Sequence, residues 1–327
     1  MSELRQDLAT KRWVIIATER AKRPDQFKRG DEKPPVAPLD PKCPFCPGNE
    51  QLTPEVILRY PQEGPWEIRV IPNKFPALEG SGEVVVHEPH GLSTTNGYGS
   101  HEVIIESPKH NLSFATLPPQ ARRKMLDVFE VRLRSLRNLP HVKFISIFRN
   151  HGRAAGTSLI HPHCQLIATP IVPTHIRQEV EESRRHYDDH VTCVYCEMMD
   201  IESNVGKRVI LDSPHFLALA PFASRTPFEM MVLPKRHCSD FGEMTMSEAN
   251  DLADMLGTVL GKMHDRLNDP DYNLMLHTAP LRDIPQDCYH WHVEILPKLT
   301  IAAGFELGTG IYINSSKPEE CAAFLRG

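Results

Sequence analysis

Two stretches of the chain place apolar residues on one face of a helix. In the first, apolar side chains recur at steps of three and four residues, at Leu126, Phe129, Leu133 and Leu136. The second carries the same pattern more densely, at Leu252, Met255, Leu256, Val259, Leu260 and Met263. Such spacing is typical of an amphipathic helix with one buried face. The pattern therefore predicts two such helices, one in each half of the chain.

Local signals mark where these helices begin. Pro118 and Pro119 suit the first turn of the earlier helix, where a missing N–H costs nothing. Thr245 stands three residues before Glu248, the capping-box spacing in which each side chain meets an unpaired backbone N–H. The segment Lys28–Pro41, with four prolines, predicts a loop. Short β-rich runs predict the strands of a sheet: Trp13 to Ile16, Val56 to Tyr60, Lys143 to Phe148, His215 to Ala220 and His292 to Leu296.

The two halves repeat one order of motifs. Each starts with a Cys-x-x-Cys pair, at Cys43–Cys46 and at Cys193–Cys196. A strand then runs into a Pro-Lys segment with a histidine, which is His110 in the first half and His237 in the second. A helix, a strand and a His-x-His pair follow. These pairs, His161-Pro162-His163 and His290-Trp291-His292, begin 51 and 53 residues after that histidine. The agreement indicates an internal duplication.

This order of elements predicts an α+β fold made of two duplicated halves. Strands outnumber helices, so we expect a mainly antiparallel sheet flanked by helices. The first unit, with the nucleophile proposed below, covers residues 1–172, and the second covers residues 191–327. A densely charged stretch flanked by Pro170 and Pro173 separates them, so residues 173–190 are interpreted as the connecting segment.

Composition narrows the classes of function. The 327 residues carry a formal charge of −5 and contain no apolar run near the roughly 18 residues of a membrane span. The N-terminal residues are charged where a signal peptide would turn apolar, so we expect a cytoplasmic protein with no membrane partner. A nucleic-acid-binding module would need a basic stripe, whereas the residues around the second cysteine pair are acidic. We therefore expect no nucleic acid partner.

Cysteine and histidine together predict two metal sites. In a reduced compartment, close cysteine pairs favour metal binding over disulfides, and tetrahedral zinc takes thiolate and imidazole ligands. The repeat gives each half four ligands: Cys43, Cys46, His110 and His161 in site one, and Cys193, Cys196, His237 and His290 in site two. Four filled positions leave no place for water, so both sites would be structural. Iron is the alternative metal at the second site. Cys238 and Cys288 are interpreted as buried side chains, although they adjoin proposed ligands.

His163 is the candidate nucleophile. Alternate residues on a strand point to opposite faces, so His163 is free to act if His161 binds metal. It follows Asn150–Ser158, a run of small residues whose N–H groups and hydroxyls can cradle a phosphate. No such loop precedes His292, which assigns the chemistry to the first half. Gln165 lies on the same face and can donate a hydrogen bond to a phosphoryl oxygen.

The neutral side chain at position 165 also bears on the reaction type. An ionisable group there could protonate a leaving alkoxide and assist hydrolysis, whereas Gln165 does not titrate. A phosphate leaving group, whose second pKa is about 6, departs without a proton. The sequence therefore favours nucleotidyl or phosphoryl transfer over hydrolysis.

These residues resemble the galactose-1-phosphate uridylyltransferases, a branch of the histidine-triad superfamily. The resemblance runs nearly end to end, through six segments: Arg20 to Pro24, Cys43 to Cys46, Asn73 to Ala77, His101 to Pro108, Asn150 to Gln165, and Gly304 to Glu306. It implies a double displacement in which UDP-glucose leaves UMP on His163 and galactose 1-phosphate collects it. It also implies a homodimer.

The resemblance assigns roles to further positions. Arg20 and Arg23 would contact phosphate groups, while Phe45 and Asn73 would line the uridine pocket. The residues implied around the phosphoryl groups are Asn150, Gly156, Ser158 and Gln165. The stretch around Glu306 would hold the hexose in a neighbouring subunit's site.

The chain also departs from the family. The best-known members lack the second cysteine pair and build a different metal cluster on histidines matching His277, His290 and His292, so His277 is not expected to be a ligand here. Cys164 replaces the usual glycine. The C-terminal hexose-binding glutamine is missing, as in a plant relative resembling an ADP-glucose phosphorylase, which uses phosphate as the acceptor. Uridylyl transfer comes first, and ADP-glucose phosphorolysis or another nucleotidyl transfer is the alternative.

Overall fold

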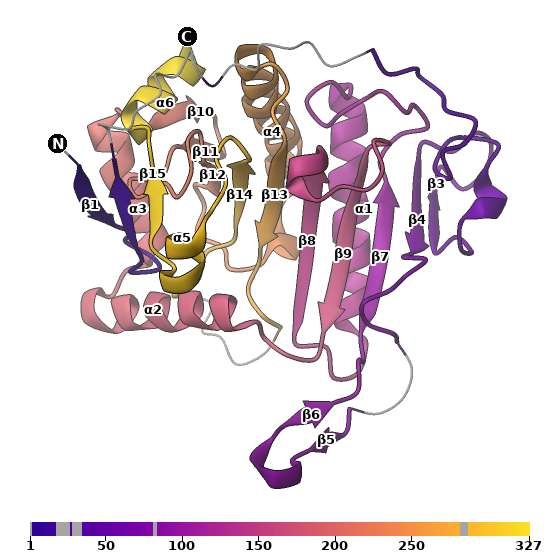
Figure 1. The fold of residues 1–327 in the computed structure, drawn as a ribbon, viewed down its shortest axis with the longest axis horizontal. Helices are drawn as coiled ribbons and strands as arrows, with labels where there is room; N and C mark the ends of the chain where they lie inside the picture. The colour runs from indigo at the N-terminus through magenta and orange to yellow at the C-terminus, as the bar shows by residue number, and fades with distance from the viewer. Residues whose placement is uncertain (1, 18–26, 28–34, 81–83, 282–286) are drawn as a thin grey trace.

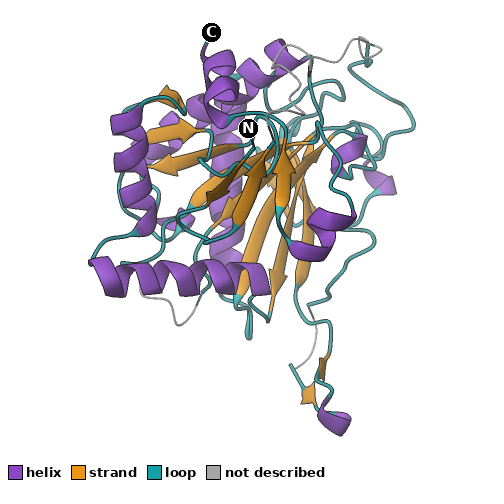
Figure 2. Ribbon diagram, turned by 60° about the vertical axis from the view of Figure 1, so that its left-hand side comes forward, coloured by secondary structure: helices purple, strands orange, loops and turns teal. Residues whose placement is uncertain are grey.

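The computed structural model describes residues 2–17, 27, 35–80, 84–281 and 287–327. Its centre is a ten-stranded antiparallel sheet, which is open and twisted (Figures 1 and 2). The strands follow one another across the sheet as β10 (Val209–Asp212), β11 (Phe216–Leu219), β12 (Met230–Pro234), β14 (His292–Pro297), β13 (Tyr272–His277), β8 (Phe144–His151), β9 (His163–Thr169), β7 (Ser100–Ile105), β4 (Ile68–Pro72) and β3 (Leu58–Tyr60). The predicted α+β class with a mainly antiparallel sheet is confirmed.

The strand order reveals the duplication. Strands β7, β9 and β8 of the first half mirror β12, β14 and β13 of the second, and the halves meet where β8 pairs with β13. Strand β8 extends three residues beyond the predicted run, to His151, because β13 continues the ladder there through the pair Tyr272 and His151. One sheet therefore spans both halves.

The two predicted amphipathic helices are α1 (Pro119–Arg137) and α4 (Met246–Leu267), which pack against each other over one face of the sheet (Figure 1). Every apolar residue used to predict them is buried. Both predicted starts are confirmed, with Pro118 at the N-cap of α1 and a capping box between Thr245 and Glu248 on α4. Gly257 gives Arg122 room to cross between the helices, because a Cβ there would lie 2.2 Å from its guanidinium carbon.

The remaining helices lie around this core. They are α2 (Thr174–His190), α3 (Val194–Val205), α5 (Gly304–Thr309) and α6 (Pro318–Arg326). The stretch interpreted as a connecting segment forms α2, which packs its apolar face on Phe144 and Tyr289. No helix within the described ranges has both the length and the apolar character that a bilayer crossing requires.

Two small sheets complete the fold. Strand β2 (Trp13–Ile16) pairs with β1 (Glu3–Gln6) on one side and with β15 (Tyr312–Asn314) on the other, so the N-terminal strands lie against the second half. Strands β5 (Val86–His87) and β6 (Thr94–Thr95) form a hairpin that projects from the body (Figure 1).

Candidate functional site

The first predicted metal site comes together as a buried cluster. Cys43 and Cys46 meet His110 and His161, with the ligand atoms of all four residues within 4.8 Å of one another. The Sγ atom of Cys46 lies 3.5 Å from Nδ1 of His110 and 3.6 Å from Nδ1 of His161. Burial lowers the pKa of His161 to about 4, so its imidazole is neutral and available as a ligand.

The second predicted site repeats this arrangement. Cys193, Cys196, His237 and His290 also bring their ligand atoms within 4.8 Å. Sγ of Cys196 lies 3.4 Å from Nδ1 of His237 and 3.6 Å from Nδ1 of His290.

The backbone orients one histidine in each cluster. Nε2 of His161 donates to the carbonyl of Ser107 at 2.7 Å, and Nε2 of His290 donates to that of Pro234 at 2.8 Å. Both acceptors stand three residues before the other histidine of their cluster. Because the proton is held on Nε2, Nδ1 faces the cysteines with a free lone pair, as a metal ligand requires. The two sets of sulfur and nitrogen donors fit a tetrahedral metal such as zinc.

His163 lies at the start of β9, next to the first cluster. Its Nδ1 donates to the carbonyl of His161 at 2.8 Å, so the proton is on Nδ1 and Nε2 keeps its lone pair. The residue is only 8 % exposed, and burial lowers the pKa of its imidazole, which favours the neutral form. The ring of Phe45 packs edge-on against it with 5.5 Å between centroids. The result is a neutral, oriented imidazole, the form a nucleophile needs.

A cavity of about 470 Å³ opens beside this histidine. Its lining includes His163, Asn150, Gly152 and Thr157 from the first half, together with Asp271 from the second. The candidate nucleophile and the small-residue loop therefore line one cavity.

The second half holds this loop in place. The backbone N–H of Ala154 donates to Oδ2 of Asp271 at 2.8 Å. Gly152 has φ +82°, and a Cβ there would lie 2.1 Å from the same carboxylate, so only glycine fits. Nδ2 of Asn273 donates to the carbonyl of Ala155 at 2.9 Å and to Oδ1 of Asn150 at 2.8 Å.

Gln165 faces the same side of β9 as His163 and has two polar neighbours. Its Oε1 lies 2.8 Å from Nε2 of His101 and 3.4 Å from Nδ2 of Asn73. The resemblance placed Asn73 in a uridine pocket, and the structure brings it to the amide of Gln165. His163 therefore shares a cavity with the loop, while Gln165, two residues further along β9, contacts His101 and Asn73.

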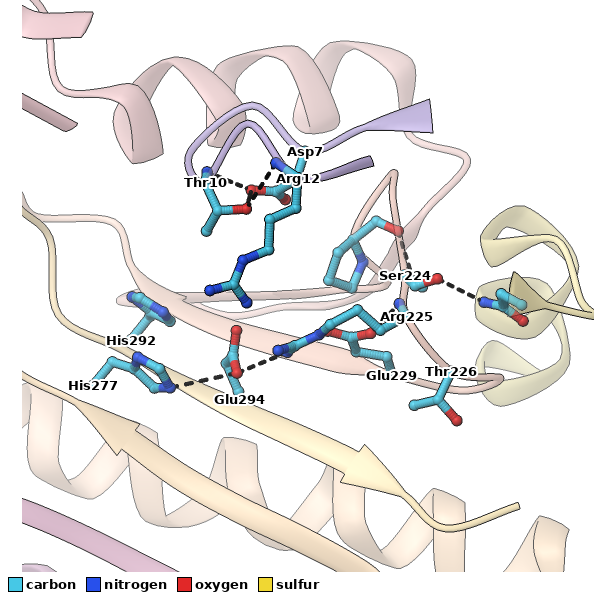
Figure 3. Close-up of polar contacts among 12 residues, drawn as sticks. Asp7, Thr10, Arg12, Ser224, Arg225, Thr226, Glu229, His277, His292 and Glu294 are labelled. Carbon is cyan, nitrogen blue, oxygen red and sulfur yellow. Dashed lines mark hydrogen bonds and ion pairs between the residues drawn. The ribbon is translucent and has the colours of Figure 1, made fainter. Parts of the chain in front are cut away.

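The equivalent histidine of the second half has a different environment. Nδ1 of His292 also donates to a carbonyl, that of His290, at 3.0 Å. Glu294 stands two residues further along, where the first half has Gln165, and His277 lies directly opposite His292 on the neighbouring strand. These residues belong to a buried network with Arg225, which pairs with Glu294 at 2.8 Å (Figure 3).

A third group that can hold a metal lies in this network. Glu179 of α2, His277 and His292 bring one ligand atom each within 4.8 Å of the others. Burial alone would lower the pKa of His277, but the carboxylates of Glu179 and Glu294 raise it to about 10. Burial lowers the pKa of His292 to about 4. In contrast to His163, His292 is enclosed by acidic groups and by the imidazole of His277.

The other predicted residues are placed as follows. Gly156 and Ser158 belong to the loop after β8, with Gly156 in the left-handed conformation at φ +91°. Arg20 and Arg23 lie outside the described residues. Glu306 lies in a separate cavity of about 350 Å³ together with Arg225 and Tyr312.

Sequence reasoning missed His101, Asn273, Asp271 and Glu179. Each is a single polar residue whose partner lies 64 or more residues away in the chain, so no local motif indicates its role. The one available signal was the strand pattern around His101, which places it on the face opposite Glu102.

Comparisons with known proteins identify the family of this chain. The family model described as "Galactose-1-phosphate uridyl transferase, N-terminal domain" matches residues 1–173, and one described as "Domain of unknown function (DUF4921)" matches residues 96–325. An ADP-glucose phosphorylase from Arabidopsis thaliana is 37 % identical over 99 % of this chain and 92 % of its own length. A galactose-1-phosphate uridylyltransferase from Thermotoga maritima is 32 % identical, over 100 % and 98 %.

Solved structures extend the likeness to the fold. The crystal structure of an ADP-glucose phosphorylase from Arabidopsis thaliana with bound ADP-glucose has a TM-score of 0.84 and 34 % identity, and covers 100 % of this chain and 99 % of that chain. A uridylyltransferase structure has a TM-score of 0.77 and 28 % identity, with coverage of 100 % and 97 %. The chain therefore belongs to the galactose-1-phosphate uridylyltransferase family of nucleotidyltransferases.

Proposed function

We propose that the protein transfers a nucleoside monophosphate from a nucleotide sugar to a phosphate acceptor through a covalent intermediate on His163. The Nε2 lone pair attacks the α-phosphorus, the bond from that phosphorus to the bridging oxygen breaks, and hexose 1-phosphate leaves with the electron pair. The acceptor's phosphate oxygen then attacks the same phosphorus and releases His163 with its lone pair. No net proton needs to be supplied to the leaving phosphate.

The observation that carries this proposal is the state of the imidazole. His163 is neutral, its Nδ1 is committed to the carbonyl of His161, and it lines the cavity with Asn150. Gln165 two residues further cannot act as a general acid, which favours transfer to a phosphate over hydrolysis. In the second half a carboxylate, Glu294, stands at that position, so the same chemistry is not proposed there.

For the donor and acceptor we propose ADP-glucose and inorganic phosphate first. The support is the likeness to the plant ADP-glucose phosphorylase, 37 % identical over nearly the full length of both chains. Uridylyl transfer from UDP-glucose to galactose 1-phosphate, first in the sequence analysis, is the second candidate. The 32 % identity to the Thermotoga maritima uridylyltransferase favours it.

Intact-protein mass spectrometry separates the two. The purified chain is incubated with ADP-glucose or UDP-glucose and no acceptor, and the mass of the protein is followed. An adenylyl adduct that inorganic phosphate discharges supports the first candidate, and a uridylyl adduct that galactose 1-phosphate discharges supports the second. No adduct with either nucleotide sugar would refute the covalent mechanism.

We further propose zinc in both cysteine-containing clusters, since two thiolates and two imidazoles suit zinc better than iron. Elemental analysis should find two zinc ions per chain. Replacing Cys193 and Cys196 by serine should remove one ion and lower the melting temperature, while the adduct still forms in molecules that fold. An unchanged metal content would contradict the ligand set.

The proposed assembly is a homodimer with the hexose site completed by a partner subunit. Glu306 lies outside the cavity of His163, and the neighbouring Ile301 and Leu307 are 93 % and 75 % exposed, which suits a contact with a second copy. Light scattering should give twice the mass of the chain, and a monomer at micromolar concentration would refute this assembly.

A further inference from the structure

We propose that His101 and Asn273 are positioning residues that hold the amides of Gln165 and Asn150 with their N–H groups toward the reacting phosphoryl group. This inference rests on the proposed transfer through His163. A side-chain amide has a donor end and an acceptor end, and only the donor end stabilises an anionic phosphoryl oxygen. What decides the direction of each amide is therefore part of the catalytic design.

A backbone N–H group determines which way the side-chain amide of Gln165 is oriented. The N–H of Ala77 donates to Nδ1 of His101 at 3.1 Å, and a backbone N–H has no acceptor role. Nδ1 of His101 must therefore accept, which places the ring proton on Nε2. That Nε2 lies 2.8 Å from the Gln165 amide, so the atom it meets must be the oxygen. The NH₂ group of Gln165 is then left for another partner.

Asn73 reinforces the same direction. Its Oδ1 accepts from the backbone N–H of Phe75 at 2.9 Å, which fixes its Nδ2 as the donor end. Nδ2 lies 3.4 Å from Oε1 of Gln165 and 3.2 Å from Nε2 of His101, so these two donor nitrogens both adjoin the one oxygen. The oxygen of Gln165 thus meets two donors, and turning the amide over would set its NH₂ group against both.

A second backbone atom decides the direction at Asn150. The carbonyl of Ala155 can only accept, so the atom of Asn273 that lies 2.9 Å from it must be nitrogen. The same nitrogen lies 2.8 Å from Oδ1 of Asn150. The NH₂ group of Asn150 therefore points away from Asn273. It faces the loop, where a Cβ built on Gly156 would lie 3.9 Å from it.

Together these contacts fix the direction of the lone pair of His163 and of both side-chain amides. The lone pair of His163 is set by the carbonyl of His161, the amide of Gln165 by the N–H of Ala77 and the amide of Asn150 by the carbonyl of Ala155. Backbone groups cannot reverse their polarity, so these directions are set before substrate binds. Donors oriented in advance lower the barrier because they need no reorganisation during the reaction.

The first test compares two substitutions of His101. Glutamine can place an amide nitrogen near the position of Nε2, whereas the shorter asparagine reaches only the position of Nδ1. In steady-state turnover with donor and acceptor, His101→Asn should lower kcat by about 10- to 100-fold with KM changed by less than about threefold, the pattern of a group that acts in the transition state. His101→Gln should recover the rate to within about fivefold of wild type. Equal losses in both variants would overturn the proposal, and His87→Asn, on the projecting hairpin, controls for the substitution itself.

A double-mutant cycle tests whether His101 acts through Gln165. Gln165→Ala removes the donor, so adding His101→Asn in that background should change kcat by no more than about twofold. Losses that multiply would overturn the proposal. The matching change on the other side is Asn273→Asp, which replaces the donor by a carboxylate and should also lower kcat by about 10-fold or more. Wild-type kcat in this variant would overturn the role of Asn273.

The ring tautomer provides a readout without any substrate. In protein with ¹⁵N-labelled histidine, the signals of His101 are those lost in His101→Gln, and they should show a bare Nδ1 and a protonated Nε2. The opposite tautomer would overturn the proposal even in an active enzyme. Absence of any nucleotide adduct with the expected tautomer would instead refute the proposed function, so the two failures are distinguishable.

Discussion

His163 and His292 occupy equivalent positions in the two halves, but their surroundings differ. Each donates its Nδ1 proton to the carbonyl two residues earlier. His163 lines a cavity together with Asn150, while His292 faces the imidazole of His277 and the carboxylate of Glu179. The same hydrogen bond from Nδ1 to a backbone carbonyl thus orients a candidate nucleophile in one half and a member of a buried network in the other.

This difference predicts one reactive histidine per chain. Asparagine keeps a donor near the position of Nδ1 and removes Nε2, so His163→Asn should abolish the nucleotidyl adduct in mass spectrometry. His292→Asn is the matched control and should still form one adduct per folded chain. An adduct on His163→Asn protein would place the nucleophile elsewhere.

The pH dependence of adduct formation follows from the burial of His163. Only the neutral imidazole has the Nε2 lone pair, and burial lowers its pKa below the usual value of about 6.5. The neutral form therefore persists as the pH falls through that value. Stopped-flow rates of adduct formation should be constant from about pH 8 to about pH 6.5 and decline only at lower pH. A decline that begins above about pH 7 would contradict the lowered pKa.

At this scale the sequence revealed the residues that belong to motifs and missed those that support them. Both cysteine pairs, their histidines and His163 carry local spacing, and the structure brings each set together. His101, Asn273 and Asp271 form hydrogen bonds with residues 64 or more positions away in the chain. When strand pairing brings two distant residues together, no periodic pattern in the sequence indicates the contact.

Among the elements, α2 makes buried contacts that the charged composition of its sequence did not indicate. Its charged composition suggested a connection between halves, and the structure shows a helix with one buried acidic residue, Glu179. That carboxylate accepts from the hydroxyl of Tyr289 at 3.0 Å and lies 3.3 Å from Nδ1 of His277. The helix is thus fixed to the sheet by a buried ion pair and by the apolar contacts of Ile176 and Val180.

Breaking this pair should be costly. Glu179→Gln leaves His277 without one of its two carboxylates, and removing one partner of a buried ion pair costs about 3–5 kcal/mol of unfolding free energy. The pKa of Glu179 is held at about 2 and that of His277 is raised to about 10. The carboxylate contribution is lost as the pH falls toward 2, and the imidazolium contribution is lost as it rises toward 10.

The loss in the variant should therefore be largest between about pH 4.5 and pH 6.5 and smaller toward either extreme. Urea unfolding at pH 5.5 and at pH 9.5 measures it. Glu181→Gln, exposed on the same helix, is the control and should change the unfolding free energy by less than about 0.5 kcal/mol. Equal losses in the two variants would show that the pair does not hold α2.

In the whole molecule, the halves are joined by hydrogen bonds between β8 and β13 rather than only by a linker. The pairing runs from Tyr272 with His151 to Leu276 with Ile147. The N-terminal strands β1 and β2 also reach the second half through β15. Neither half therefore presents a closed surface on its own.

This arrangement predicts cooperative unfolding of the two halves. The amides of β8 and β13 lie at the centre of the sheet and should exchange hydrogen slowest, whereas those of the edge strands β3 and β10 should exchange faster. Hydrogen–deuterium exchange with mass spectrometry measures both. Exchange at β8 and β13 as fast as at β3 would show that the halves open apart.

The sequence predicted the two equivalent halves because a duplication repeats its motifs along the chain. It did not predict how the halves join. The β8–β13 pairing occurs once, at the junction of the two halves, so no repeated motif marks it in the sequence. The position of strands β1 and β2 against the second half was likewise not predictable, because one short strand such as Trp13–Ile16 is compatible with many partners.

The fixed direction of the amides has a consequence for analogue and inhibitor chemistry. Amides that cannot rotate always present their N–H groups to the ligand. They can therefore bind a ligand atom with a lone pair, but not one that carries hydrogen. A phosphoramidate analogue with an amino group in place of a non-bridging oxygen on the α-phosphorus would set its own N–H bonds against those of Asn150 or Gln165. A thiophosphate keeps lone pairs at that place, so the site should tolerate sulfur there and reject nitrogen.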